Sequence, residues 1–257
     1  MTQPKRPLRH LLFLLLPLLA VLLTPTERAT AQDAPGDFIP SACMFKGIDL
    51  GLTTLTGEAL GFECGYVVVP ERHEAAGGRT IRLPVAIHRA QGGAPDPLLV
   101  AQGGPGGDAF AVYSLLAPNT PMAASRDIVI FNQRGTPYAK PDLSCPETEA
   151  ALAEILAAPA GEGEKLYNAA IAACGERLRR ENVDLSAYNS LENAADVPVI
   201  ARALGSSEYN FYGVSYGTLL GLHLMRNYPD GLRSLVMYSV VPTDFNTMYF
   251  VATNVGA

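Results

Sequence analysis

The sequence predicts an α/β fold with a mostly parallel sheet and flanking helices. From Leu98 onward, short continuous apolar runs alternate with longer segments of helical pattern, as buried parallel strands alternate with crossover helices. Two earlier β-patterned runs, separated by a glycine turn, indicate an antiparallel start to the same sheet. A glycine–serine–glycine sequence at residues 213–217 lies between a predicted strand and a predicted helix, and it indicates a reactive serine at that turn.

Residues 1–31 have the pattern of an export signal. Basic residues precede the uncharged run Leu11–Leu23, and Ala29-Thr30-Ala31 fits the rule for signal cleavage. The run is interrupted by Pro17 and is shorter than the roughly 20 residues that a membrane-spanning helix needs. We therefore expect cleavage after Ala31, no stable membrane anchor, and a periplasmic or extracellular location.

The remainder of the chain, residues 32–257, is long enough for one sizeable core and is expected to form one domain. The net charge is -6, and no cluster of Lys and Arg follows the signal. This composition argues against a nucleic acid or an anionic membrane as partner. It carries no information on the oligomeric state.

The elements are expected in the following order. Residues 32–60 are an irregular lead, and the α/β domain spans residues 61–257. The first two strands are Tyr66–Val69 and Ile81–Ile87, joined through the turn at Gly77-Gly78. The four expected parallel strands are Leu98–Ala101, Asp127–Phe131, Glu208–Tyr212 and Leu232–Tyr238. The expected helices are Ala109–Leu116, Glu147–Leu156, Gly163–Glu181, Ala194–Leu204 and Thr218–Asn227.

All four cysteines lie in the exported part, where thiols tend to be oxidised. Their spacing matches no zinc pattern, so we expect no metal site. Four cysteines allow three pairings, and proximity along the chain favours Cys43 with Cys64 and Cys145 with Cys174. Both bridges are expected to be structural.

The corner at residues 213–217 is interpreted as a nucleophile elbow. Ser215 would occupy a sharp strand-to-helix turn, and Gly213 and Gly217 would let the strand and helix approach closely. The alternative is a serine in an ordinary glycine turn. The apolar strand before the corner and the helical pattern after it favour the elbow.

A second glycine cluster, Gly103–Gly107, directly follows the strand Leu98–Ala101. In an acyl-transfer enzyme of this architecture, one oxyanion N–H comes from this loop and one from the residue after the nucleophile. These donors would be Gly104 and Tyr216. The alternatives are a phosphate-cradling loop or a plain turn, but the P-loop ending and the G-x-G-x-x-G spacing are both missing.

A third segment, Asn132–Thr136, follows the strand Asp127–Phe131. Residues at the carboxyl ends of parallel strands face the ligand crevice. Arg134 would either steer or brace the loop that bears the oxyanion donors, or lie on the surface in a turn. The residues alone favour neither interpretation.

Three motifs in this order, GGPG at 103–106, NQRGT at 132–136 and GVSYGT at 213–218, resemble the exported tripeptidyl aminopeptidases and proline iminopeptidases of the α/β-hydrolase fold. The segments Cys64–Pro70 and Leu143–Cys145 also resemble the tripeptidyl type, so the resemblance covers roughly residues 43–244. It implies an α/β-hydrolase fold with Ser215 as nucleophile.

The chain departs from this pattern at several positions. Gln102 stands where proline iminopeptidases usually carry His, which favours the tripeptidyl type. Asn132 replaces a usual Asp, and Pro137 stands where Gly is frequent. Met237 and Tyr238 stand where the strand after the elbow usually ends in an acidic residue.

A serine nucleophile needs a base and a group that orients the base, in the order Ser, Asp or Glu, His in this fold. The candidates after Ser215 are His223, Asp230 and Asp244. His223 lies two helical turns beyond the serine and is expected to point away as an ordinary helix histidine. Asp230 precedes the last strand, and Asp244 follows it away from the expected triad position. The other histidines are His10, His73 and His88, all before the parallel strands.

We therefore expect the triad Asp and His to lie outside this chain, which would be the N-terminal part of a larger hydrolase. A gene fragment, a frameshift or a true short paralogue would each give this sequence. The strand Leu232–Tyr238 would form an uncovered edge. The 257-residue chain is expected to be inactive toward peptide p-nitroanilides and prone to aggregate.

The resemblance implies an exported serine exopeptidase that releases N-terminal residues or short peptides through an acyl-enzyme at Ser215, without a cofactor. One alternative is an esterase-like hydrolase with the same core. Another is a non-catalytic exported scaffold that lacks the triad base. The sequence does not indicate the preferred peptide length or residue.

Overall fold

The computed structural model describes residues 33–45, 55–75 and 77–244. The predicted export signal and the stretch 246–257, for which the sequence predicts the start of a further helical element, lie outside these residues. Within the described ranges, no helix combines the length and apolar character needed to cross a membrane.

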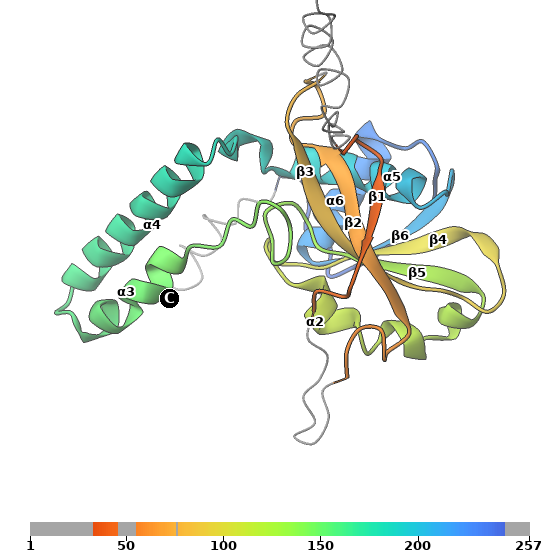
Figure 1. Ribbon diagram of the computed structural model, residues 1–257, viewed down its shortest axis with the longest axis horizontal. Coiled ribbons are helices and arrows are strands. Elements are labelled where there is room, and N and C mark those ends of the chain that lie inside the picture. Colours follow the sequence, from red (N-terminus) through yellow and green to blue (C-terminus); the bar gives the residue numbers. More distant parts are fainter. Residues whose placement is uncertain (1–32, 46–54, 76, 245–257) are drawn as a thin grey trace, which may run out of the picture. The chain divides into compact units, whose positions relative to one another are not determined.

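A seven-stranded sheet runs through the domain in the order β1-β2-β3-β5-β4-β6-β7 (Figure 1). Its strands are β1 (Phe38–Ser41), β2 (Phe62–Pro70), β3 (Thr80–His88), β4 (Ala94–Ala101), β5 (Arg126–Phe131), β6 (Tyr209–Val214) and β7 (Leu232–Tyr238). The pairs along β1-β2-β3-β5 are antiparallel, whereas β5-β4-β6-β7 is a parallel block. Both the antiparallel start and the four parallel strands were predicted from the sequence.

Strand β1 was not predicted, because residues 32–60 were expected to be an irregular lead. Phe38–Ser41 contains Pro40 and shows no apolar alternation. It pairs with β2 in the register Phe38 opposite Val67 and Ser41 opposite Cys64. Proline is tolerated on an edge strand because its missing N–H can face away from the ladder. The strand is therefore defined by its neighbour rather than by its own sequence.

The sheet is covered on two faces. On one face, α5 (Ser190–Ala203) and α6 (Tyr216–Asn227) pack with the largest core cluster, which contains Phe211 of β6. On the other face, α2 (Ala109–Tyr113) and the 3₁₀ turns η2 (Ala117–Asn119) and η3 (Pro121–Ala124) contribute to a second cluster, which Tyr212 packs against. Neighbouring β6 residues face opposite layers, as the two-residue period of a strand requires.

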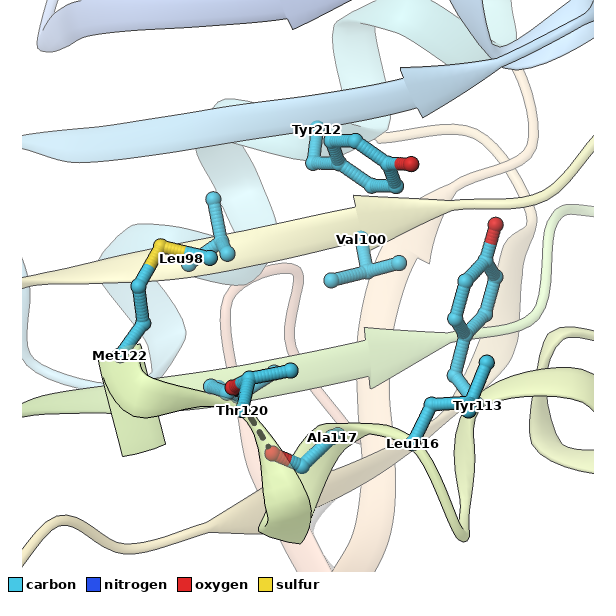
Figure 2. A pocket seen from close by; sticks show the side chains of 9 residues that line it. Leu98, Val100, Tyr113, Leu116, Ala117, Thr120, Met122 and Tyr212 are labelled. Atoms are coloured by element: carbon cyan, nitrogen blue, oxygen red, sulfur yellow. Dashed lines mark hydrogen bonds between the residues drawn. The ribbon is translucent and has the colours of Figure 1, made fainter. Parts of the chain in front are cut away.

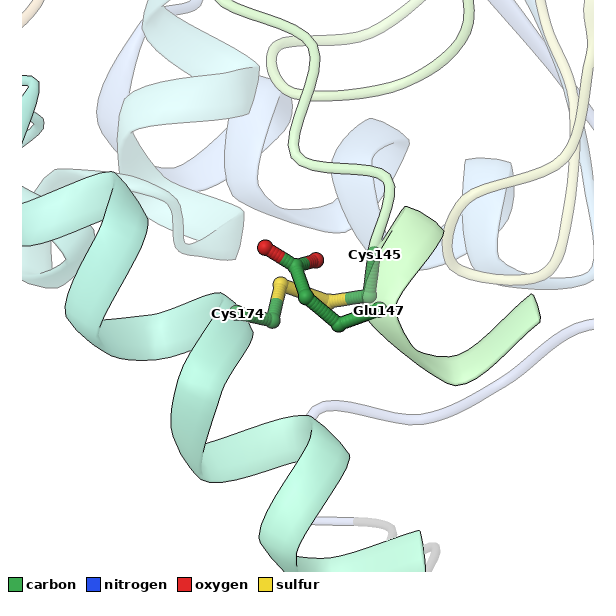
Figure 3. Close-up of side chains that lie close together, drawn as sticks. All are labelled: Cys145, Glu147 and Cys174. Carbon is green, nitrogen blue, oxygen red and sulfur yellow. A yellow bond between two sulfur atoms is a disulfide. The ribbon is translucent and has the colours of Figure 1, made fainter. Parts of the chain in front are cut away.

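Helices α3 (Pro146–Ala157) and α4 (Glu162–Arg180) pack against each other in the segment between β5 and α5. The bridge Cys145–Cys174 joins the start of α3 to α4, and Cys43–Cys64 ties the lead to β2. Both predicted pairings are present. Glu147 lies beside the second bridge (Figure 3) and forms an ion pair with Arg177 at 2.7 Å. The sulfurs of Cys145 and Cys174 are bonded to each other, and Glu147 is paired with Arg177, so all three side chains make structural contacts.

Strand β7 is the outer strand of the described sheet. Two of its apolar side chains are largely exposed, Val236 at 53% and Tyr238 at 64%. The predicted strand-to-helix corner lies one strand inward, between β6 and α6.

Candidate active site

Ser215 forms the corner between β6 and α6. Its backbone angles are φ 52° and ψ −117°, a conformation that costs a non-glycine residue strain. The corner is held from two sides, because the Ser215 N–H donates to the Tyr238 carbonyl at 2.9 Å and the Thr218 hydroxyl donates to the Ser215 carbonyl. The Ser215 side chain is half-buried. The turn presents a hydroxyl group at the carboxyl end of the parallel block.

The flanking glycines fit because no side chain could occupy their positions. A Cβ added to Gly213 would lie 2.4 Å from the Gly217 carbonyl oxygen. A Cβ added to Gly217 would lie 2.5 Å from the Ala101 carbonyl oxygen. Both contacts are with backbone atoms, which cannot move aside cheaply. The two glycines allow α6 to start directly against β6 and β4.

The glycine loop Gly103–Gly107 follows β4 and borders the serine. A Cβ added to Gly103 would lie 2.8 Å from the Ser215 Cβ and 3.3 Å from its Oγ. Gly104 and Gly106 have φ of 121° and 94°, which only glycine adopts without strain. Among the hydrogen bonds of the described residues, none engages the N–H of Gly104 or of Tyr216. The loop thus places main chain beside the hydroxyl and leaves two nearby donors unpaired.

The side chains of Asn132 and Gln133 reach the two ends of this loop. Gln133 Nε2 donates to the Gln102 carbonyl at 2.8 Å, and Asn132 Oδ1 accepts the Ala109 N–H at 2.7 Å. Asn132 Nδ2 also donates to Asp108 at 2.9 Å, a bond that an ionised aspartate at position 132 could not make. The departure to asparagine therefore suits its surroundings here.

Arg134 is fully buried, so it does not lie on the surface, and none of its hydrogen bonds reaches the glycine loop. Its guanidinium contacts both carboxylate oxygens of Asp196 on α5, at 2.7 and 2.9 Å, and donates to the carbonyls of Glu71 and Ala187. Burial opposes its charge, but the facing Asp196 carboxylate raises the pKa of Arg134 overall. Asp196 was not among the predicted site residues.

An open cleft of about 450 Å³ lies between the glycine loop, the turn around Arg134 and the start of α5. Pro105, Tyr216 and Asn193 are among the residues that line it. Asn193 is buried, and its Oδ1 has no hydrogen-bond partner in the described part of the protein. This cleft borders Tyr216, the residue after Ser215.

A smaller apolar pocket of about 280 Å³ lies on the α2 face of the sheet (Figure 2). Leu98, Val100 and Tyr212 point into it from the strands, and Leu116, just before η2, and Met122 of η3 close it. None of its lining residues belongs to the elbow, the glycine loop or the turn around Arg134. It is therefore separate from the candidate active site.

No histidine of the described residues is hydrogen-bonded to Ser215. The His223 ring lies 3.4 Å from the Asn227 amide, one turn further along α6, and partial burial lowers its pKa. His73 Nε2 lies 2.8 Å from Asp196, and the His88 Nδ1 is buried without a partner among the described residues. Asp244 lies exposed after β7. The structure thus brings Ser215, the glycine loop and the turn around Arg134 together, and none of the residues it describes is hydrogen-bonded to the Ser215 hydroxyl as a base.

A parallel sheet with a serine at a strained strand-to-helix corner defines the class of this chain. It belongs to the alpha/beta hydrolase fold family, whose model matches residues 96–253. The chain is 31% identical over 204 residues to tripeptidyl aminopeptidase of Streptomyces coelicolor, covering 74% of this chain and 37% of that protein. It is 24% identical over 191 residues to serine protease Hip1 of Mycobacterium tuberculosis, covering 70% of this chain and 36% of that protein.

These relatives confirm the resemblance predicted from the three motifs. The chain spans little more than a third of the length of the curated relatives that it matches. Among solved structures, a putative epoxide hydrolase from Pseudomonas aeruginosa is similar at 19% identity and a TM-score of 0.44. That match covers 76% of this chain and 48% of the other.

Proposed function

We propose that this chain carries the nucleophile and the oxyanion donors of an exported serine exopeptidase that releases N-terminal residues or short peptides. The observation that carries the proposal is the corner at Ser215, where a half-buried hydroxyl in a strained turn lies against the glycine loop. Strained backbone of this kind persists where the surrounding structure holds it in place, and it clusters at active sites.

In the proposed reaction, Ser215 Oγ attacks the scissile carbonyl of a peptide. The N–H groups of Gly104 and Tyr216 stabilise the oxyanion that forms on the carbonyl oxygen. The absence of a protein acceptor for either N–H among the described residues supports this role, because a donor already in use could not serve it. The flanking Gly213 and Gly217 hold the elbow.

Attack requires that the serine proton be removed, and the described residues supply no base within reach. The proton would pass to a histidine that none of His73, His88 or His223 provides, and from there to the leaving amine as the peptide C–N bond breaks. Water would then hydrolyse the acyl-enzyme and restore the Ser215 hydroxyl. No cofactor enters this chemistry. The peptide substrate is proposed from the printed names of the relatives, and export from the signal-like start of the chain and the two disulfides.

The test supplies the base from solution. The 257-residue protein is treated with a fluorophosphonate in the presence and absence of imidazole, and the adduct is located by mass spectrometry. We expect imidazole-dependent modification of Ser215, absent in Ser215→Ala and retained in Ser207→Ala, whose serine is exposed and precedes the opposite end of β6. Modification of Ser215 no faster than that of Ser207 would refute the proposal and favour a non-catalytic scaffold.

A second measurement separates the exopeptidase from an esterase. Imidazole-assisted turnover is compared between a tripeptide p-nitroanilide with a free amino terminus and a p-nitrophenyl ester of a short acid. Hydrolysis of the peptide substrate, lost in Ser215→Ala, supports the exopeptidase. Hydrolysis restricted to the ester would replace it with the esterase.

A further inference from the structure

We propose that Asn132 and Gln133 are positioning residues that hold the glycine loop Gly103–Gly107 from its two ends, so that its N–H groups stay aligned with Ser215. The alignment part of this inference rests on the proposed function. The holding part rests on geometry alone and is measured separately below.

The first contact fixes the start of the loop. Gln133 is 2% exposed, and its Nε2 donates to the carbonyl oxygen of Gln102 at 2.8 Å. That carbonyl belongs to the peptide group whose N–H is on Gly103, the residue packed against the Ser215 side chain. A bond to this oxygen therefore fixes the plane of the peptide that enters the loop.

The second contact fixes the end of the loop. Asn132 is fully buried, and its Oδ1 accepts the Ala109 N–H while its Nδ2 donates to Asp108 and to the Pro137 carbonyl. Because the backbone N–H of Ala109 can only donate, it settles which amide atom of Asn132 faces it. Asp108 in turn caps α2 by accepting the Phe110 N–H at 3.0 Å. Asn132 thus ties the cap of α2 to the turn after β5.

Between these two ties the loop has little support of its own. Residues 104–106 are exposed, and the one backbone hydrogen bond within Gly103–Gly107 runs from the Gly107 N–H to the Gly103 carbonyl at 3.2 Å. Glycine segments lose the most conformational freedom on ordering. A single loop conformation therefore has to be imposed from its ends, where the two buried amides lie.

The residue that follows Gln133 anchors the turn. Arg134 binds Asp196 of α5 with two hydrogen bonds and reaches the carbonyls of Glu71 and Ala187. Buried, bidentate contacts of this kind leave the turn little freedom to shift. The path of support runs from α5 through Arg134 to the two amides and then to the glycine loop.

The experiment measures backbone hydrogen exchange of the segment 103–108 in the unliganded 257-residue protein, read at the Gly107 N–H, which is hydrogen-bonded to the Gly103 carbonyl and so has protection to lose. In Gln133→Met, which keeps the length of the side chain and removes the donor, exchange in this segment is expected to rise about tenfold. Gln133→Glu, which places a carboxylate against the Gln102 carbonyl, is expected to do the same and serves if the first variant folds poorly. Thr136→Val is the matched control, because it removes a buried hydroxyl that donates to the Gln133 carbonyl at 2.7 Å and forms no hydrogen bond to the loop.

The positioning role is supported if exchange in 103–108 rises in both Gln133 variants and does not rise in Thr136→Val. If the two Gln133 variants and Thr136→Val show the same exchange in this segment at the same loss of global stability, the positioning role is refuted. Imidazole-dependent phosphonate modification of Ser215 is measured on the same samples and is expected to slow at least about tenfold in the Gln133 variants. If the wild-type protein is not modified while the exchange effect is present, the proposed function fails and the holding contacts stand. Unchanged modification together with raised exchange would refute the alignment part.

Discussion

The turn Asn132–Thr136 and the glycine loop Gly103–Gly107 are neighbours of opposite character. They follow β5 and β4, which are adjacent parallel strands. In the turn, Asn132, Gln133 and Arg134 are at most 3% exposed, and their side chains are hydrogen-bonded. In the loop, residues 104–106 are exposed and the Gly104 N–H has no acceptor among the described residues.

The difference reflects two requirements, free hydrogen-bond donors and a rigid backbone, which a single segment cannot easily meet together. Oxyanion stabilisation needs donors that are free and already in position. Free donors are tolerated where water can reach them, whereas rigidity comes from buried, paired groups. In the proposed reaction the exposed loop supplies the Gly104 donor, and the buried, hydrogen-bonded turn beside it would supply the rigidity. Four tests, each a set of substitutions, measure how the turn, the loop and their surroundings share these tasks, taken from the largest expected effect to the smallest.

The largest effect is expected from Arg134→Met. The substitution keeps most of the side-chain volume but leaves the Asp196 carboxylate, 1% exposed, without its buried partner. Removing one member of such a pair costs about 3–5 kcal/mol in the free energy of unfolding, which urea denaturation measures. Arg72→Met is the control, because Arg72 pairs with Asp184 at 38% and 42% exposure and is worth less than about 1 kcal/mol. If Arg134→Met and Arg72→Met lower the free energy of unfolding equally, the turn around Arg134 is not more rigid than the exposed surface.

A matched pair of glycines compares the turn and the loop directly. Gly135 and Gly106 both have positive φ, 74° and 94°. A Cβ on Gly135 would lie 2.7 Å from Leu143 and 2.9 Å from Tyr188, whereas a Cβ on Gly106 would meet nothing within 4 Å. We expect Gly135→Ala to cost about 3 kcal/mol, from strain and overpacking, and Gly106→Ala about 1 kcal/mol, from strain alone.

The same denaturation series measures both glycine variants. Hydrogen exchange of the segment 103–108 provides the second readout. Exchange in Gly106→Ala should rise even though this variant loses little global stability. A cost for Gly106→Ala as large as that for Gly135→Ala would mean that the loop is packed in solution.

The amino ends of the same strands provide a third test, through pH. Asp96 at the start of β4 accepts a hydrogen bond from Asn210 at 2.9 Å and pairs with Arg126. The Asn210 hydrogen bond and then the Arg126 contact lower the pKa of Asp96 from 3.8 to about 2. Because the folded pKa lies below the unfolded one, this stabilisation is present above about pH 4 and is lost as the pH falls toward 2.

The contribution of Asp96 is expected to be about 2 kcal/mol at neutral pH. Urea unfolding at pH 6 and at pH 2.5 measures it as the difference between wild type and Asp96→Asn. The gap between the two proteins should narrow at the lower pH. A constant gap would show that the charge of Asp96 does not account for its effect.

These contrasts also explain what the sequence could and could not predict. The parallel strands and the elbow are local patterns, since an apolar run and two glycines around Ser215 are adjacent in the chain. The partner of Arg134 is not local, because Asp196 follows it by 62 residues on a helix that was expected to begin at Ala194. Helix α5 begins earlier, at Ser190, where Asn189 caps it by accepting the N–H groups of Leu191 and Glu192.

The amides of Asn132 and Gln133 were missed for a related reason. Their positions just after a strand indicated the ligand crevice, and the motif drew attention to the charged residue instead. Whether a polar side chain after a strand faces a ligand or its neighbouring loop depends on strand order, here β5 beside β4. Two polar residues before a buried arginine, on the strand next to the glycine loop, are the signal that could have found them.

The smallest expected effect concerns the link between the elbow and α5. The Tyr216 hydroxyl lies 3.0 Å from the Ser190 hydroxyl, so the residue after Ser215 contacts the same helix that holds Arg134. Tyr216→Phe removes this hydrogen bond and keeps the ring, and it is expected to lower the free energy of unfolding by no more than about 1 kcal/mol. Ser190→Ala removes the other partner and should give a similar value. A double variant that costs no more than either single one would assign the loss to this hydrogen bond. If the losses of the two single variants add fully in the double variant, the elbow is held independently of α5. The buried turn around Arg134 would then be the route by which α5 supports the glycine loop.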